Sequence, residues 1–128
     1  KPFHPLVKEY KALRKADVTS NLIAYSKLCI VTAALNEGWT PKFIKGEKRY
    51  SPCFFLYTDK EIRNMSEEEK SRVVYLSCDY ASGGVSLAFT ICDTTTVRFG
   101  SRLAFKTSEL AEYAGKQFGK LYANYLGI

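Results

Sequence analysis

The C-terminal segment, residues 100–126, most constrains the fold of this 128-residue chain, because it joins a helix start signal to a helical apolar stripe. Thr107 or Ser108 can accept a hydrogen bond from an amide of the first helical turn. The apolar residues that follow recur at helical spacing, and they are Leu110, Ala114, Phe118, Leu121 and Tyr125. The pattern predicts one amphipathic helix packed on the core of its own domain, with Tyr122 at its margin and a short strand over residues 100–106 before it.

A second helix is predicted over residues 19–37, where a wide apolar surface indicates burial on more than one side. Its end is marked because Gly38 can adopt the left-handed conformation and Pro41 cannot continue a helix. Nearer the N-terminus, Leu6, Tyr10 and Leu13 alternate with lysines and indicate a separate amphipathic helix.

Between the helices the pattern changes to that of strands. Residues 52–57, 72–78 and 85–92 are short runs rich in β-branched and aromatic residues, and residues 81–84 predict a hairpin between the last two. Ser66 and Glu69 match a capping box, which predicts a short exposed helix within the acidic insertion at residues 59–70.

These elements predict an α+β fold with one domain over residues 1–128. In it, a small, mostly antiparallel sheet is packed on one face by two main helices, with shorter helices beside them. No segment approaches the roughly 18 uninterrupted apolar residues that cross a bilayer, so no membrane partner is expected. The chain starts at Lys1 instead of Met, which is compatible with removal of an upstream segment.

The cysteines argue against a metal site. Cys29, Cys53, Cys78 and Cys92 form no Cys-x-x-Cys pair, and His4 is the single histidine. Each cysteine lies in an apolar or aromatic run, so free thiols in an intracellular protein are predicted, although an even count also permits disulfides. The chain contains neither a phosphate-binding loop nor a Gly-x-Ser-x-Gly elbow. No catalytic residue, cofactor or metal is therefore predicted.

Two blocks of the sequence carry a resemblance. The first block, residues 33–41, reads Ala-Ala-Leu-Asn-Glu-Gly-Trp-Thr-Pro. The second block begins with Gly-Ser-Arg-Leu-Ala-Phe-Lys at residues 100–106. It continues with Glu-Leu-Ala-Glu-Tyr-Ala-Gly-Lys-Gln-Phe at residues 109–118 and Leu-Tyr at residues 121–122. In these blocks, and more loosely in the aromatic-proline run at residues 50–54, the chain resembles a family of small uncharacterised proteins encoded by phages and prophages of gut anaerobes. The acidic insertion at residues 59–70 departs from that family. The resemblance implies a common fold and a place in the cytoplasm of a bacterial host, and it implies no catalytic residues.

The charge balance is the sequence feature with most functional content. A net charge of +6 and a pI near 9.1 favour an anionic partner. Cations and aromatic rings occur together in two clusters, which are Lys42, Phe43, Lys45, Lys48 and Arg49, and Arg98, Phe99, Arg102 and Lys106. Cations can follow phosphates while exposed rings stack on bases. The sequence therefore predicts a non-catalytic binding module with nucleic acid as its favoured partner.

A protein partner is the alternative. Nine tyrosines suit a protein-protein or self-associating module that acts on a host or phage protein. An enzyme is the least favoured class, since His4, Asp79 and Asp93 form no recognisable catalytic arrangement. A shared, exposed basic face would favour nucleic acid, whereas an exposed neutral aromatic patch would favour a protein. The oligomeric state stays open.

Overall fold

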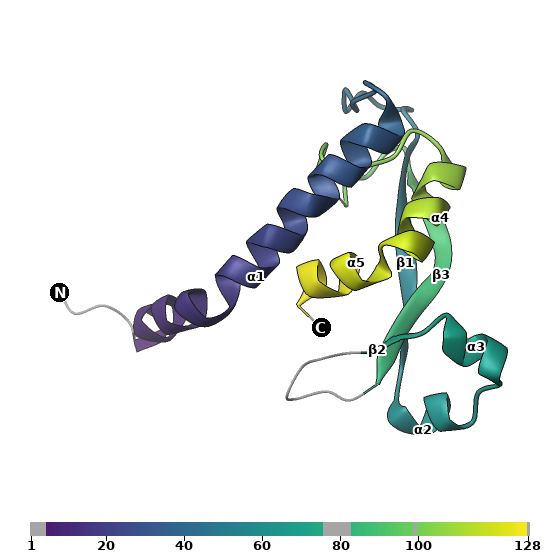
Figure 1. Cartoon of the computed structure of the whole chain (residues 1–128). Coiled ribbons are helices and arrows are strands. Elements are labelled where there is room, and N and C mark those ends of the chain that lie inside the picture. The colour runs from purple at the N-terminus through teal and green to yellow at the C-terminus, as the bar shows by residue number, and fades with distance from the viewer. Residues whose placement is uncertain (1–4, 76–82, 99, 128) are drawn as a thin grey trace.

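The computed structural model describes residues 5–75, 83–98 and 100–127, with side chains from residue 20 onward within those ranges. The first elements are the helix α1 (Pro5–Asn36), the strand β1 (Arg49–Tyr57), and the short helices α2 (Asp59–Arg63) and α3 (Glu67–Ser71). The strands β2 (Val74–Tyr75) and β3 (Gly84–Asp93) and the helices α4 (Ser108–Gln117) and α5 (Gly119–Leu126) follow. The predicted α+β class is confirmed (Figure 1).

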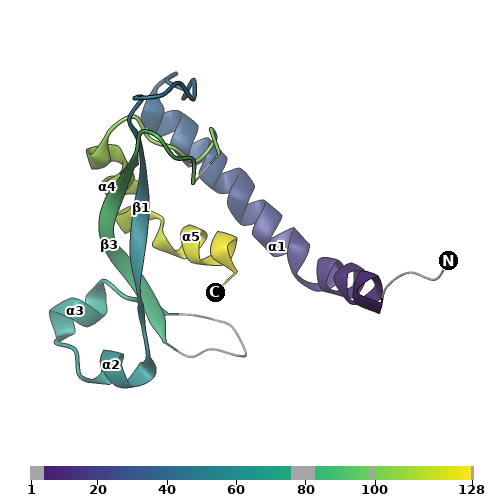
Figure 2. The ribbon, with the colours of Figure 1, turned by 180° about the vertical axis from the view of Figure 1, so that it is seen from behind.

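The three described strands form one antiparallel sheet in the order β1-β3-β2. Helix α4 contacts β1 and β3, α5 contacts β3 and β2, and α1 packs on α5 and α4. Seen from behind in Figure 2, β1 and β3 lie in front of α4 and α5, so these two helices share one face of the sheet.

Two glycines let the C-terminal helices lie close to the sheet. A Cβ atom on Gly115 would lie 2.6 Å from Leu87 Cδ1 and 2.9 Å from Pro52 Cβ, and one on Gly119 would lie 3.1 Å from Val74 Cγ2. Any larger side chain at residue 115 would push α4 away from β1 and β3.

The core is built around Phe105, whose side chain is fully buried. Tyr50 and Phe105 exchange backbone hydrogen bonds of 2.9 and 2.8 Å, which pair β1 with the chain that leads into α4. The buried Asn36 side chain donates to the Ala104 carbonyl at 2.9 Å and accepts from the Lys106 amide at 3.1 Å. The end of α1 is thereby fixed to the same short segment.

Helix α1 differs from the prediction in its start. It runs without a break from Pro5 to Asn36, so the separate N-terminal helix and the start at residue 19 are wrong. The cause is plain in the sequence, because neither Gly nor Pro interrupts residues 6–37. The N-terminal half of α1 runs away from the sheet and from the other helices (Figures 1 and 2).

The expected burial of α1 on more than one side is also wrong. Ala24, Leu28 and Thr32, spaced by one helical turn, are buried, whereas the side chains of Ile23 and Ile30 are 51% and 71% exposed. Helices α5 and α4 pack on α1, and among its described side chains the buried ones lie on a single face. The apolar residues of a helix show how much of its surface could be buried, and the elements that pack against it decide how much of that surface is buried.

The C-terminal segment contains two helices, where one was predicted. Thr107 caps α4 as expected, since its Oγ1 accepts from the Leu110 amide at 3.2 Å. The helix is then interrupted at Phe118, and α5 begins at Gly119. The predicted margin residue Tyr122 is buried, with its ring centroid 5.5 Å from that of Phe54. Residues 100–106 form only the bridge of Phe105 to Tyr50 instead of a strand.

The remaining predictions hold in part. β1 and β3 cover the predicted strands at 52–57 and 85–92 and extend beyond them. Of the predicted strand at 72–78 only β2 is seen, and residues 76–82, with most of the predicted hairpin, lie outside the described residues. The capping box of Ser66 and Glu69 is confirmed, and a second one, Thr58 with Glu61, divides the acidic insertion into α2 and α3.

Two composition-based expectations can be compared with this structure. Cys29, Cys53 and Cys92 are free thiols, and Cys78 lies outside the described residues. Within the part of the chain that the structure describes, no helix is long and apolar enough to span a membrane.

Replacing Gly115 with Ala should lower the free energy of unfolding by ~1–3 kcal/mol, because the new methyl group overlaps Leu87 and Pro52. Urea denaturation followed by circular dichroism measures the change. Gly100→Ala is the matched control, since a Cβ at that position meets no described atom within 4 Å. Equal stability of the two variants would contradict the close approach of α4 to the sheet.

Candidate nucleic-acid interface

The two cationic clusters of the sequence meet in space. The Gly46 amide donates to the Thr94 carbonyl at 3.1 Å, and Arg49 Nη2 donates to the Thr96 carbonyl at 2.6 Å. These bonds join the loop before β1 to the loop after β3. We call the resulting surface the basic end, and its exposed cations are Lys42, Lys45, Lys48 and Arg98, with the exposed Arg102 farther along the loop after β3, within electrostatic range of Tyr25 in α1.

Arg49 has a structural position inside this region. Its side chain is only 6% exposed, its guanidinium lies 5.1 Å from the centroid of the Phe43 ring, and its Nη1 lies 3.3 Å from Glu47 Oε1. Arg49 was predicted as part of the binding surface. The structure instead places it beneath that surface, where its donors bind the protein's own oxygens.

Glu47 organises the loop from within. Its carboxylate accepts from the Lys42 amide at 2.9 Å and from the Phe43 amide at 3.0 Å. Phe43 has a φ of +56°, a conformation that bulky residues rarely adopt unless surrounding contacts hold them in it. The hydrogen bonds from the Lys42 and Phe43 amides, followed by that from Arg49, hold the pKa of Glu47 below its usual value.

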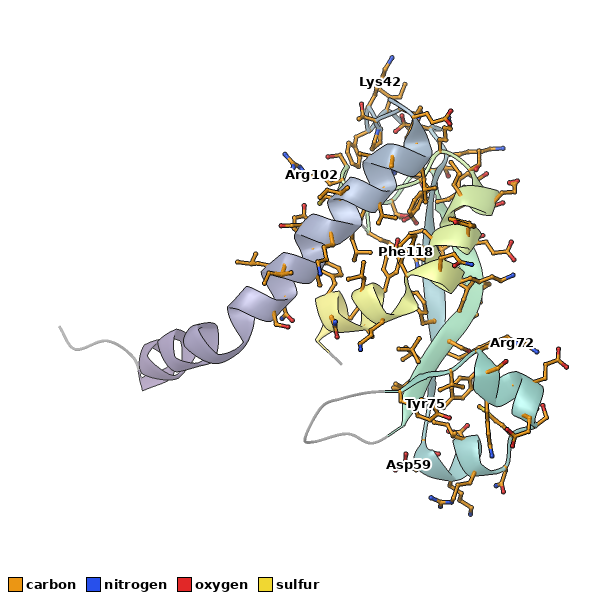
Figure 3. The ribbon with its side chains drawn as sticks, in the orientation of Figure 1. Lys42, Asp59, Arg72, Tyr75, Arg102 and Phe118 are labelled. Atoms are coloured by element: carbon orange, nitrogen blue, oxygen red, sulfur yellow. The ribbon has the colours of Figure 1, made fainter. Side chains whose placement is uncertain are left out.

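The other predicted residues lie at different depths. The Phe43 ring is 41% exposed, Lys106 is half-buried, and Phe99 lies outside the described residues. Arg98 is 54% exposed and forms an ion pair with the buried Asp93 through a contact of 3.2 Å. Figure 3 shows Lys42 and Arg102 at the end of the molecule opposite to Asp59.

Charge is distributed unequally between these two ends. Residues 37–49 and 93–106 contain seven Lys or Arg against three acidic residues, whereas residues 59–72 contain four against five. The basic end therefore carries a net charge of +4 and the α2–α3 end a net charge of −1, while residues 1–36 carry a further +4. Of the two ends compared, the basic end is the one that would attract a polyanion.

The sequence analysis did not predict several residues that belong to this surface. Ile44 and Val97 are 62% and 66% exposed and border a shallow hollow of about 370 Å³ between the two loops. Glu47 belongs to neither predicted cluster, although its carboxylate accepts from the Lys42 and Phe43 amides. The bond between Arg49 and Thr96 spans 47 residues, and no local signal pairs positions so far apart.

No protein-family model, curated protein or solved structure matches this chain. Among the side chains that the structure describes, no group of three or more His, Cys, Asp or Glu residues is placed to hold a metal ion. His4 and Asp79 lie outside the described residues, and Asp93 is engaged by Arg98 and by the Thr96 hydroxyl.

Arg49→Lys separates charge from geometry, because lysine keeps the charge but lacks the planar fork that reaches Thr96 and Glu47 together. We expect the free energy of unfolding to fall by ~1–3 kcal/mol, the usual size for a lost hydrogen bond from a charged group. Urea denaturation measures it, with the exposed neighbour changed as Lys48→Arg for comparison. A variant as stable as the unchanged protein would show that Arg49 does not fasten the two loops.

The Glu47 carboxylate should give the loop a dependence on pH. Because its pKa is depressed in the folded protein, its hydrogen bonds stabilise the loop above the ordinary pKa of glutamate and are lost as the pH falls through the lower, folded-state value. Amide resonances of Lys42 and Phe43, followed by NMR from pH 7 to pH 2, should shift with a midpoint below 4.5. The same resonances should stay flat in Glu47→Gln, and a midpoint at or above the ordinary value would refute the interaction.

Proposed function

We propose that this chain is a non-catalytic binding module that holds nucleic acid by its phosphates at the basic end. The observation that carries the proposal is the joining of two distant cationic loops into one exposed surface. The exposed cations lie on loops that backbone and side-chain hydrogen bonds hold in place. Such bonding reduces the cost of ordering the loops when a partner binds.

Contacts to the phosphates would dominate the affinity. Lys42, Lys45 and Lys48 project from the loop before β1, and Arg98 and Arg102 lie beyond the end of β3. Each cation that neutralises a phosphate releases counterions, so the affinity depends steeply on salt. Such contacts position a strand without reading its sequence.

The half-exposed Phe43 ring supports a single-stranded partner over a duplex. It is fixed from behind by the Arg49 guanidinium and lies among the lysines of the loop. A ring held in this way can stack on an unpaired base, which a paired base in a duplex does not allow. We therefore expect single strands to bind more tightly than duplexes of the same length.

The biological setting of the proposal comes from the sequence resemblance. A small basic module of the phage or prophage type would act as an accessory factor in the cytoplasm of the bacterial host. A catalytic role receives no support from the described side chains.

One observation favours a protein partner as the second candidate function. Phe54 contacts Tyr122 on the helix side of the sheet, so its neighbour Phe55 points to the opposite side. Phe55 and Phe89 are 51% and 55% exposed, and Phe89 lies opposite Cys53, two residues before Phe55 in β1. A neutral pair of exposed rings suits a protein surface.

The double variant Arg98→Ala, Arg102→Ala tests the first candidate. Fluorescence anisotropy with labelled single-stranded and duplex oligonucleotides, at roughly 50 and 200 mM salt, should show tight, salt-sensitive binding by the unchanged protein. The variant should bind more weakly, and the slope of log K against log salt should fall by about 1 for each phosphate contact removed.

The variant Lys60→Ala, Arg63→Ala is the matched control. It removes the same charge from α2, at the opposite end of the molecule, and should leave affinity almost unchanged. Equal losses in the two double variants would mean that net charge alone attracts the oligonucleotide. No binding at the lower salt concentration would refute the nucleic-acid function and leave the protein partner.

A further inference from the structure

A groove lies along the edge of β3 that faces away from β1. It has a volume of about 840 Å³ and is floored by residues 85–90 of β3. Helix α4 forms one wall through Glu112 and Lys116, and the other wall is formed by Glu68 of α3 and by Arg72, which follows that helix. Figures 1 and 2 both place α4 and α3 on the same side of β3, near opposite ends of the strand.

This edge is open because β2 begins only at Val74. Within the described residues β2 pairs with Val85 and Gly84, so it covers the beginning of β3 and leaves the rest to the groove. The chain before β2 turns away into α3. An edge strand that is neither paired nor covered offers its backbone groups to another strand.

The register with β1 shows which backbone groups face the groove. Tyr50 lies opposite Cys92 and exchanges its backbone hydrogen bonds with Phe105 on the other side. Pro52, which has no N–H, lies opposite Thr90. In an antiparallel pair such positions direct their N–H and C=O groups away from each other, so those of Thr90 and Cys92 point to the open edge. Within the described residues neither makes a hydrogen bond across that edge.

We propose that this groove binds an extended segment of a partner protein, which adds to the sheet as a strand beside β3. The five residues from Ser86 to Thr90 offer an edge about 17 Å long, enough for a segment of five or six residues. Backbone hydrogen bonds would supply register, and alternate side chains would meet the apolar groups on the helix side, Val74 and Leu87.

Charge distinguishes this groove from the basic end. Lys116 Nζ lies 2.9 Å from Glu112 Oε1, and Arg72 Nη2 lies 3.1 Å from Glu68 Oε1, so each wall carries one balanced pair. A polyanion would meet a carboxylate on both walls. A polypeptide backbone, which is neutral and has alternating donors and acceptors, complements this surface.

The walls also select a free segment over a second copy of this chain. The open edge is recessed between α3 and α4. The edge strands of a second copy, β1 and β2, are themselves contacted by α4 and α5, which would have to enter the groove with them. A linker or chain terminus can enter such a slot. An interface of this size is small, so the affinity should be on the order of micromolar.

The test uses a random library of linear twelve-residue peptides, selected on the immobilised full chain. The best peptide is then synthesised with a fluorophore, and its Kd is measured by anisotropy. Thr90→Pro removes the N–H that points into the groove and should weaken binding about tenfold, the factor for one lost backbone hydrogen bond. Thr90→Val keeps that N–H and should stay within about twofold of the unchanged protein.

Ser71→Trp provides a variant that does not alter the strand. Ser71 is exposed at the end of α3 and lines the groove, so a tryptophan there would obstruct it, and peptide binding should again fall. In the unchanged protein, bound peptide should slow hydrogen exchange at the amide of Thr90, which points into the groove. Thermal unfolding shows whether each variant is folded before its Kd is used.

Any of three results would overturn the proposal. The selection would yield no peptide that binds, or the peptide would bind both Thr90→Pro and Ser71→Trp with full affinity, or the bound peptide would slow hydrogen exchange only at amides outside the groove. Oligonucleotide binding should be unaffected by these variants, and peptide binding should be unaffected by Arg98→Ala, Arg102→Ala. The groove and the basic end can therefore fail or succeed separately.

Discussion

The reciprocal backbone hydrogen bonds between Tyr50 and Phe105 are the contact on which the other parts of this molecule depend. They place the fully buried Phe105 ring between α1, β1 and α4. Asn36 then binds the residues on both sides of Phe105, so the end of α1 is fixed to the same segment. Buried polar groups must find partners, and here the partners are backbone atoms from distant parts of the chain.

This junction also sets the two surfaces of interest. β1 begins and β3 ends beside it, and their adjoining loops are held together there by Arg49. At the other end of the sheet, β2 begins only at Val74, just after α3, and leaves β3 open beyond Val85. The positive surface and the neutral groove therefore lie at different places along one strand, which would allow a polyanion and a polypeptide to bind together.

Local patterns identified those elements whose signals lie within a few residues. The Thr107 cap and the capping box of Ser66 and Glu69 need only neighbouring side chains, and both were predictable. The break at Phe118 and the single bridge at Phe105 were not, because they depend on how α4, α5 and β1 fit together. The binding residues divide in the same way, since charge can be read directly but the burial of Arg49 depends on Thr96.

The sequence by itself determined the α+β class, the helix caps, the strand segments and the excess of positive charge, because each follows from composition or short-range spacing. Only the tertiary structure decided that two cationic clusters share one surface, that Arg49 lies beneath it, and that the edge of β3 stays open between α3 and α4. These features arise from contacts between residues far apart in the chain. Such contacts are chosen by packing and by the pairing of buried polar groups, for which no local pattern exists.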